Sequence, residues 1–237
     1  MSINWQAFRL TIELALVVST ILFVVGLPLA YWIAFSRRRW KFFVEALVGL
    51  PIVLPPTVLG FYVLVALGSR SPLGRWWQSL TGHTLAFTFA GLVIGSIIYS
   101  LPFVVQPFAA SFSSVDGKLL AASATLGASP LRTFFQVVLP LSVPGLVTGV
   151  ALAFAHTMGE FGVVLMIGGN IPGVTRTVAI DIYDQVQASN YAAANAMALL
   201  LLVFCFVVLT VVYGLNRATP NRRSTNRETW AMGPVKK

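Results

Sequence analysis

The chain has few charged side chains, one cysteine and two histidines among its 237 residues. Charged residues make up 10% of it and hydrophobic residues 57%, a balance outside the range of soluble domains. The single cysteine, Cys205, excludes a disulfide framework and a cysteine-based metal site. The histidines, His83 and His156, are far apart in the sequence, so we expect no metal site and no metalloprotease chemistry. The composition indicates a polytopic membrane protein of one domain.

The sequence also lacks a phosphate-binding loop of the Walker type, so we expect neither ATPase activity nor a bound cofactor on this chain. No nucleophile stands with a base and no catalytic residue is predicted, which disfavours a membrane-embedded enzyme. Glu160 is almost the only acid inside the apolar segments, which disfavours an ion-coupled secondary transporter. The net charge of +9 indicates no nucleic-acid partner, because the bases lie in short clusters beside apolar stretches.

Five apolar stretches reach the roughly 20 residues that a membrane-spanning helix needs. They are about Thr11–Phe35, Phe43–Leu67, Leu85–Ala110, Val138–Thr157 and Ala194–Leu215. A sixth stretch, Phe161–Gly168, is too short to cross and predicts a half helix or a re-entrant piece. We therefore expect an all-α fold in which residues 1–216 form the membrane domain and residues 217–237 a basic, disordered tail.

The distribution of bases predicts the orientation of the five spans. The N-terminal apolar run lacks the basic region and cleavage site of a signal peptide, so we count it as the first span. Four of the 16 lysines and arginines then fall on one side of the membrane, and residues 68–84 form a loop on that side. The other twelve are Arg37, Arg38, Arg39, Lys41, Lys118, Arg132, Arg217, Arg222, Arg223, Arg227, Lys236 and Lys237. The positive-inside rule places these twelve in the cytoplasm and the N-terminus outside.

Residues 115–144 are the longest moderately polar interval and predict two short helices with a break. Asp116 is a candidate N-cap of the first helix, and Gly127 ends it. Ser129 then caps a second helix that starts with a proline. In that second helix a spacing of i, i+3, i+4 and i+7 predicts one apolar face, formed by Leu131, Phe134, Phe135 and Val138. Such a segment either docks on a partner or packs on its own bundle.

The same interval resembles the EAA loop of ATP-binding-cassette (ABC) importer permeases, whose pattern is Glu-Ala-Ala, three residues, Gly, nine residues, Ile-x-Leu-Pro. The matching positions are Ala121, Ala122, Ser123, Gly127, Val137, Leu139 and Pro140. Three of them differ from the pattern in residue type, namely Ala121, Ser123 and Val137. The resemblance implies a type I importer permease whose coupling helices dock in a cleft of a separate ATPase subunit, with Leu131, Phe134 and Phe135 as anchors.

Prolines, glycines and one acid single out two further regions. Pro51, Pro55 and Pro56 must kink or break the second span. Two Gly-x-x-x-Gly motifs, at 91–95 and 145–149, allow close helix contacts. Glu160 ends the fourth span, and His156 lies one helical turn before it, so that a His–Glu pair is geometrically available. That pair would serve either the transport pathway or helix packing.

The stretches 154–162 and 169–177 resemble the molybdate-type permease subunits, which are related to sulfate permeases. The resemblance implies a homodimer in a bacterial or archaeal cytoplasmic membrane, two ATPase subunits that bind ATP and Mg²⁺, and an external oxyanion-binding protein. Its cargo would be molybdate, with tungstate or sulfate as alternatives. Ten residues are candidates for the pathway or gate: Pro55, Pro56, His156, Gly159, Glu160, Gly162, Asn170, Thr175, Arg176 and Thr177.

Overall fold

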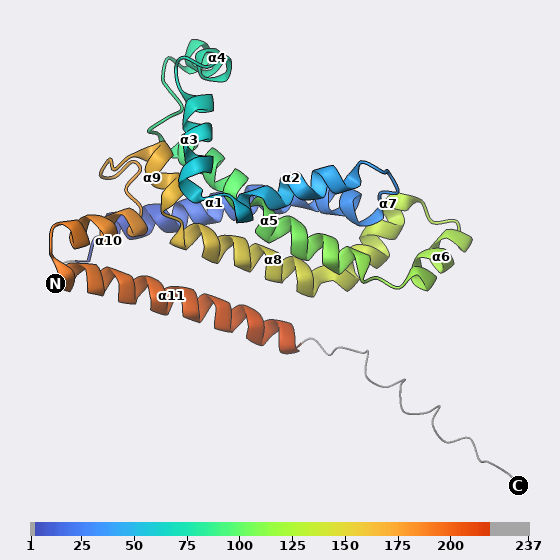
Figure 1. Ribbon diagram of the computed structural model, residues 1–237. Coiled ribbons are helices and arrows are strands. Elements are labelled where there is room, and N and C mark those ends of the chain that lie inside the picture. The colour runs from blue at the N-terminus through green and yellow to red at the C-terminus, as the bar shows by residue number, and fades with distance from the viewer. Residues whose placement is uncertain (1–2, 219–237) are drawn as a thin grey trace, which may run out of the picture.

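The computed structural model describes residues 3–218, which form helices and no strand (Figure 1). The elements are α1 (Trp5–Phe35), α2 (Lys41–Val53), α3 (Pro56–Leu67), α4 (Pro72–Thr81), α5 (Phe89–Ser113), α6 (Gly117–Thr125), α7 (Pro130–Thr133), a π-helical turn (Phe134–Val138), α8 (Leu139–Gly159), α9 (Gly162–Gly168), α10 (Val178–Gln187) and α11 (Tyr191–Ala218). The expected all-α class is confirmed. Residues 219–237, most of the expected tail, lie outside the described residues.

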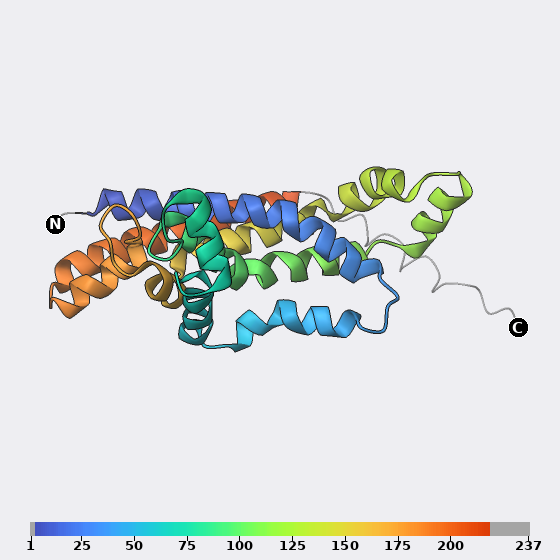
Figure 2. The same cartoon turned by 90° about the horizontal axis from the view of Figure 1, so that it is seen from above.

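Three long helices, α1, α5 and α8, pack along one another and form the centre of the bundle (Figures 1 and 2). Phe108 and Phe112 of α5 and Leu22 of α1 are completely buried between them. Gly26 brings α1 close to α5, since a Cβ there would lie 2.7 Å from Cγ1 of Val104. α11 packs on α8 and α10 and buries few of its apolar side chains, as a lipid-facing helix does.

Four helical segments are long and apolar enough to span a membrane, and the second expected span is a bent pair that brings the number to five. The stretch Phe43–Leu67 is therefore not one straight helix: α2 and α3 meet at 112°. Pro55 and Pro56 cause the break, because neither has an N–H to continue the helix. The thirteen residues of α2 rise only about 20 Å, less than the hydrocarbon core of about 30 Å. In Figure 1, α3 stands across the long helices and carries α4 at its far end.

Two helices were not predicted from the sequence, α4 and α10. The loop expected over residues 68–84 is wrong in its middle part, where α4 begins after a Ser71 N-cap and ends at Gly82, whose φ is +75°. The hydroxyl oxygen of Ser71 accepts a hydrogen bond from the Gly74 N–H at 2.8 Å. Both helices are ten residues long, which is short for detection by apolar periodicity alone.

The two Gly-x-x-x-Gly motifs pack against helices of this same chain. A Cβ at Gly145 would lie 2.5 Å from the Ser111 side chain, and one at Gly149 would lie 2.8 Å from the Phe108 ring. Likewise, a Cβ at Gly95 would lie 2.3 Å from the Ile167 side chain of α9. These contacts let the backbones of α5, α8 and α9 approach closely, so the motifs are used inside the subunit.

Candidate functional site: an exposed α5–α8 segment and a pocket between two helix breaks

The α5–α8 segment, residues 115–144, has the capped helices that the sequence predicts. The Asp116 carboxylate accepts a hydrogen bond from the Lys118 N–H at 2.9 Å and caps α6. Gly127 follows the end of α6 with a φ of +73°, a left-handed conformation that favours glycine. The Ser129 hydroxyl oxygen accepts a hydrogen bond from the Arg132 N–H at 3.3 Å, and Pro130 is the first residue of α7. The predicted caps and the break at Gly127 are confirmed.

The single apolar face predicted for the second helix is wrong. α7 continues through the π-helical turn into α8, and the Leu139 N–H donates to the Phe134 carbonyl oxygen five residues earlier. This wider turn changes the spacing, so Phe134 points into the bundle, with its ring centroid 5.0 Å from that of Tyr31. Val138 is buried as well. Leu131 and Phe135 stay outside, with 68% and 56% of their surface exposed.

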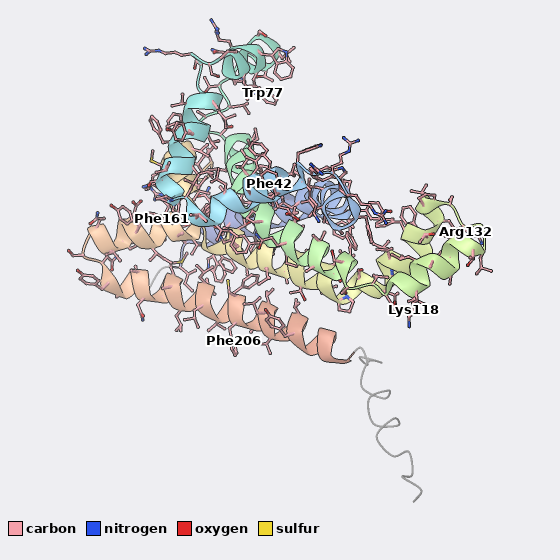
Figure 3. All side chains as sticks on the ribbon, turned by 45° about the vertical axis from the view of Figure 1, so that its right-hand side comes forward. Phe42, Trp77, Lys118, Arg132, Phe161 and Phe206 are labelled. Atoms are coloured by element: carbon pink, nitrogen blue, oxygen red, sulfur yellow. The ribbon has the colours of Figure 1, made fainter. Side chains whose placement is uncertain are left out.

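The outer surface of the segment carries exposed apolar side chains beside polar and charged ones, and a hydrogen bond joins its two helices. The Ser123 and Thr133 hydroxyls are 2.7 Å apart and join α6 to the end of α7. In Figure 3, Lys118 and Arg132 lie on this segment, beyond the end of the helix bundle. Leu126 is exposed beside them. Among the other predicted docking residues, Leu139 is partly buried, and the exposed ones are Ala121, Ala122, Gly127 and Pro140.

Partway along the bundle, the break between α2 and α3 touches the break between α8 and α9 (Figure 1). Gly162, the first residue of α9, packs against Pro56, the first residue of α3; a Cβ on Gly162 would lie 2.6 Å from the Pro56 Cβ. Between the breaks lies a pocket of about 610 Å³, which we call the break pocket. It is lined by Pro56, Thr57, Tyr99, Ala155, His156, Gly159, Glu160, Phe161, Gly162, Leu165 and Met166. Pro55 precedes α3 and is exposed.

Glu160 occupies the break between α8 and α9 and has an extended backbone. Its side chain is 4% exposed, and neither carboxyl oxygen has a hydrogen-bond partner among residues 3–218. The predicted pair with His156 does not form. Instead, His156 Nδ1 lies 3.0 Å from the Ser100 hydroxyl, and its ring stacks on Phe103 with centroids 4.0 Å apart. α8 ends at Gly159, so the helical i, i+4 geometry on which the expected pair depended is lost at the glutamate.

The loop between α9 and α10 joins Asn170, Arg176 and Asp184 in one cluster. Arg176 Nε donates to the Asn170 side-chain oxygen at 2.6 Å, and its terminal nitrogen lies 3.6 Å from the Asp184 carboxylate. The Asn170 amide donates to the same carboxylate. The Thr175 hydroxyl donates to the Gly168 carbonyl oxygen at 2.7 Å. Arg176 therefore carries a paired charge, and its Nε–H helps to hold this loop.

Several polar residues of the break pocket and of the Arg176 loop do not stand out in the sequence. Tyr99, Ser100 and Asp184 were not singled out. Thr177 was a predicted candidate; it is buried, and its hydroxyl has no partner among the described residues. Ser96 and Ser100 are one turn apart within an apolar span, a spacing that would have pointed to a polar stripe on α5. Within residues 3–218, no group of three histidine, cysteine, aspartate or glutamate side chains could hold a metal ion.

Residues 26–220 match the family model described as "Binding-protein-dependent transport system inner membrane component". The chain is 53% identical to the "Molybdenum transport system permease protein ModB" of Azotobacter vinelandii over 211 residues, which are 89% of this chain and 93% of that one. It is 33% identical to the protein of that name from Escherichia coli K12 over 224 residues, covering 92% and 96%.

Solved structures of ABC importers share the fold. The MetNI methionine transporter in an inward-facing conformation matches with a TM-score of 0.73 at 18% identity, covering 92% of this chain and 99% of that one. A bacterial alginate transporter in complex with its pentasaccharide-bound periplasmic protein matches with a TM-score of 0.76 at 16% identity, covering 92% and 80%. The chain therefore belongs to the family of binding-protein-dependent transport system inner membrane components, as a multi-pass permease with the fold of ABC importers.

Proposed function

We propose that this chain is the permease subunit of an ABC importer that carries molybdate into the cytoplasm. The observation that carries the proposal is the 53% identity, across 93% of its length, with a permease named for molybdenum transport. Tungstate and sulfate are tetrahedral dianions of the same charge and are the alternative cargoes. A secondary transporter is disfavoured because Glu160 is nearly alone as an acid within the apolar segments.

Two copies of this chain would form the pathway, with two ATPase subunits on the cytoplasmic side and an oxyanion-binding protein outside. The alginate transporter with its periplasmic protein supports the binding-protein partner. ATP and Mg²⁺ would bind to the ATPase, and this permease would hold no cofactor. The bases that follow α1 and α11 favour a cytoplasmic C-terminus and an external N-terminus.

The α5–α8 segment is the surface that we assign to the ATPase. Exposed apolar surface marks protein-binding sites, and Leu126, Leu131 and Phe135 are exposed on this segment at the end of the bundle. Because Phe134 packs inside the bundle, we assign the anchoring role to Leu131 and Phe135. ATP-driven closure of the ATPase pair would draw the two segments together and rock the spans as rigid bodies.

The α5–α8 segment is joined to the bundle by a continuous helix, which suits it to transmit this motion. Pro130–Gly159 runs without interruption from the exposed α7 to the break pocket. A displacement at Leu131 would therefore move the lining of the pocket through one stiff element. We propose that the α5–α8 segment and the break pocket are coupled in this way. The segment would receive the ATPase motion, and the pocket would pass the cargo.

ATP-driven uptake of labelled molybdate into vesicles that contain the permease and its ATPase tests this function. We expect uptake that depends on ATP and resists excess sulfate. Phe135→Asp should reduce uptake about tenfold or more, because it places a charge in a desolvated contact. Phe135→Leu keeps an apolar side chain at the same position and is the matched control.

The cargo and the coupling are decided by separate outcomes. Uptake that is abolished by excess sulfate would move the cargo assignment to sulfate. Uptake without the ATPase would overturn the importer assignment and favour a secondary transporter. Equal uptake in the two Phe135 variants would show that this side chain does not contact the ATPase.

A further inference from the structure

The break pocket lacks the charged group that a dianion would be expected to meet. Four of its lining residues are polar: Thr57 of α3, Tyr99 of α5, His156 of α8 and Glu160. No lysine or arginine lines it. α9 contributes only apolar residues and glycine, so the titratable groups that face Glu160 are Tyr99 and His156. An oxyanion in this pocket would have to be bound by uncharged hydrogen-bond donors.

Glu160 is one of two buried carboxyl groups in the described residues, and their surroundings differ. Asp181 of α10 accepts a hydrogen bond from the Asn4 side chain at 2.8 Å. In contrast, neither oxygen of Glu160 has a partner among residues 3–218. The buried Ser96 hydroxyl is the polar group that lies beside the Glu160 carboxyl, although no hydrogen bond of normal geometry joins the two side chains. Both oxygens are also shielded from solvent, so a group that enters the pocket would reach them only once the side chain turns toward it.

An ionised carboxylate in these surroundings is unfavourable for two reasons. Burial without a compensating cation costs several kcal/mol, of which a single neighbouring hydroxyl can offset only a part. Its negative charge would also repel a dianion that passes through the pocket. A protonated carboxylic acid avoids both costs, and it has an O–H that can donate a hydrogen bond.

His156 can act as the second donor. Its Nδ1 is held by the Ser100 hydroxyl, and the ring lies between Phe103 and Tyr99 at centroid distances of 4.0 and 4.8 Å. When Ser100 donates to Nδ1, the neutral imidazole carries its hydrogen on Nε2. The stacking fixes the ring, and Nε2–H is then available to a ligand.

We propose that Glu160 is protonated and, together with His156, binds the oxyanion at an intermediate subsite in the break pocket by donating hydrogen bonds to it. This inference rests on the proposed function, because it names the residues that meet the cargo. Two neutral donors hold a dianion less tightly than a lysine or an arginine would, so the ion can leave again. The volume of about 610 Å³ has room for the ion with part of its hydration water.

Infrared spectroscopy of the purified permease–ATPase complex tests the protonation directly. The wild-type complex should show a carboxylic-acid carbonyl band that is absent from Glu160→Gln and kept in the matched control Asp181→Asn. Adding molybdate should shift the band, because the O–H becomes a donor to the ion. The absence of a band assigned to Glu160 overturns the inference, whatever the uptake assay gives.

Uptake in vesicles then tests the donor role. Glu160→Gln keeps a donor of the same size and should transport within about threefold of wild type, whereas Glu160→Leu should lose about tenfold or more. Equal losses in both variants, or a requirement of wild-type uptake for sodium or potassium, would show a needed negative charge or a cation site and overturn the inference. Full uptake by Glu160→Leu would overturn it as well.

The wild-type assay is read first and separates this inference from the proposed function. A wild-type complex that carries no oxyanion contradicts the proposed function, and the inference falls with it. A wild-type complex that transports molybdate, combined with variants that behave otherwise than stated, contradicts the inference alone.

Discussion

The α5–α8 segment and the break pocket have opposite arrangements of polar and apolar groups. In the α5–α8 segment, Leu126 and Leu131 are exposed, and polar side chains such as Asp116 and Ser129 bind backbone groups nearby. In the break pocket, the polar Glu160 is buried without a partner. An apolar surface with satisfied polar groups suits contact with a protein, whereas unsatisfied buried polar groups suit a small polar ligand.

The α5–α8 segment and the break pocket also differ in the sequence separation between the residues that form them. The α5–α8 segment is built from local contacts, such as the bond between Ser123 and Thr133 ten residues apart. The break pocket requires α3, α5, α8 and α9 together. Substitutions in the exposed segment should therefore change docking and spare the fold, while substitutions at the helix breaks should affect both. Variants at both places test this difference, and the largest effect on stability is expected for a buried ring.

Phe134 and Phe135 are neighbours that should behave differently. Phe134→Ala removes a ring that packs on Tyr31 and Phe112, so we expect a loss of about 3 kcal/mol in the free energy of unfolding. Phe135→Ala should cost less than about 0.5 kcal/mol, because the side chain is mostly outside. Denaturation of the purified protein in detergent measures both. Similar losses would mean that the π-helical turn does not direct Phe134 alone into the bundle.

Gly162 tests the contact between the two helix breaks. Gly162→Ala would place a methyl group 2.6 Å from the Pro56 Cβ, and a proline ring cannot move aside as a flexible side chain can. We expect a loss of about 1–3 kcal/mol in the free energy of unfolding, together with slower uptake.

Gly159→Ala is the matched control, since no atom lies within 4 Å of a Cβ at that position of the same pocket. It should leave the unfolding temperature unchanged. A destabilised Gly159→Ala variant would indicate that the pocket is filled more tightly than the structure shows.

Gly127 tests the turn of the exposed segment. Its φ of +73° disfavours any side chain, so Gly127→Ala should cost about 1–2 kcal/mol within the segment, although no atom crowds the position. Hydrogen exchange of the α6 amides should accelerate, and the affinity for the ATPase should fall. The unfolding temperature of the bundle should not change. Gly117→Ala, which has open space and no positive φ, is the control.

The sequence predicts those parts of this molecule that depend on nearby residues. The caps at Asp116 and Ser129, the turn at Gly127 and the break at Pro55–Pro56 follow from local chemistry, and the structure has all four. The five apolar stretches likewise identify the membrane helices, because length and composition are sufficient for that.

What could not be predicted depends on distant contacts. The angle of 112° between α2 and α3 is set by the packing of α3 on α9, over a hundred residues away. The partner of His156 is Ser100 on α5, and the spacing to Glu160 gave no sign of it. The π-helical turn departs from the regular period of 3.6 residues, so the sequence spacing did not predict the inward position of Phe134.

Asp184 gives the smallest expected effect and tests whether the cluster with Arg176 depends on charge. Asp184→Asn removes the negative charge and keeps an oxygen that can accept from the Asn170 amide. Because the pair is partly exposed, we expect a loss of about 0.5 kcal/mol or less at low salt. Hydrogen exchange in residues 169–177 measures it locally. High salt should remove the difference between variant and wild type if the attraction is Coulombic, since screening weakens pairs that solvent can reach. A difference that persists in high salt would instead show that the hydrogen bonds of Asn170 and Arg176 hold the loop.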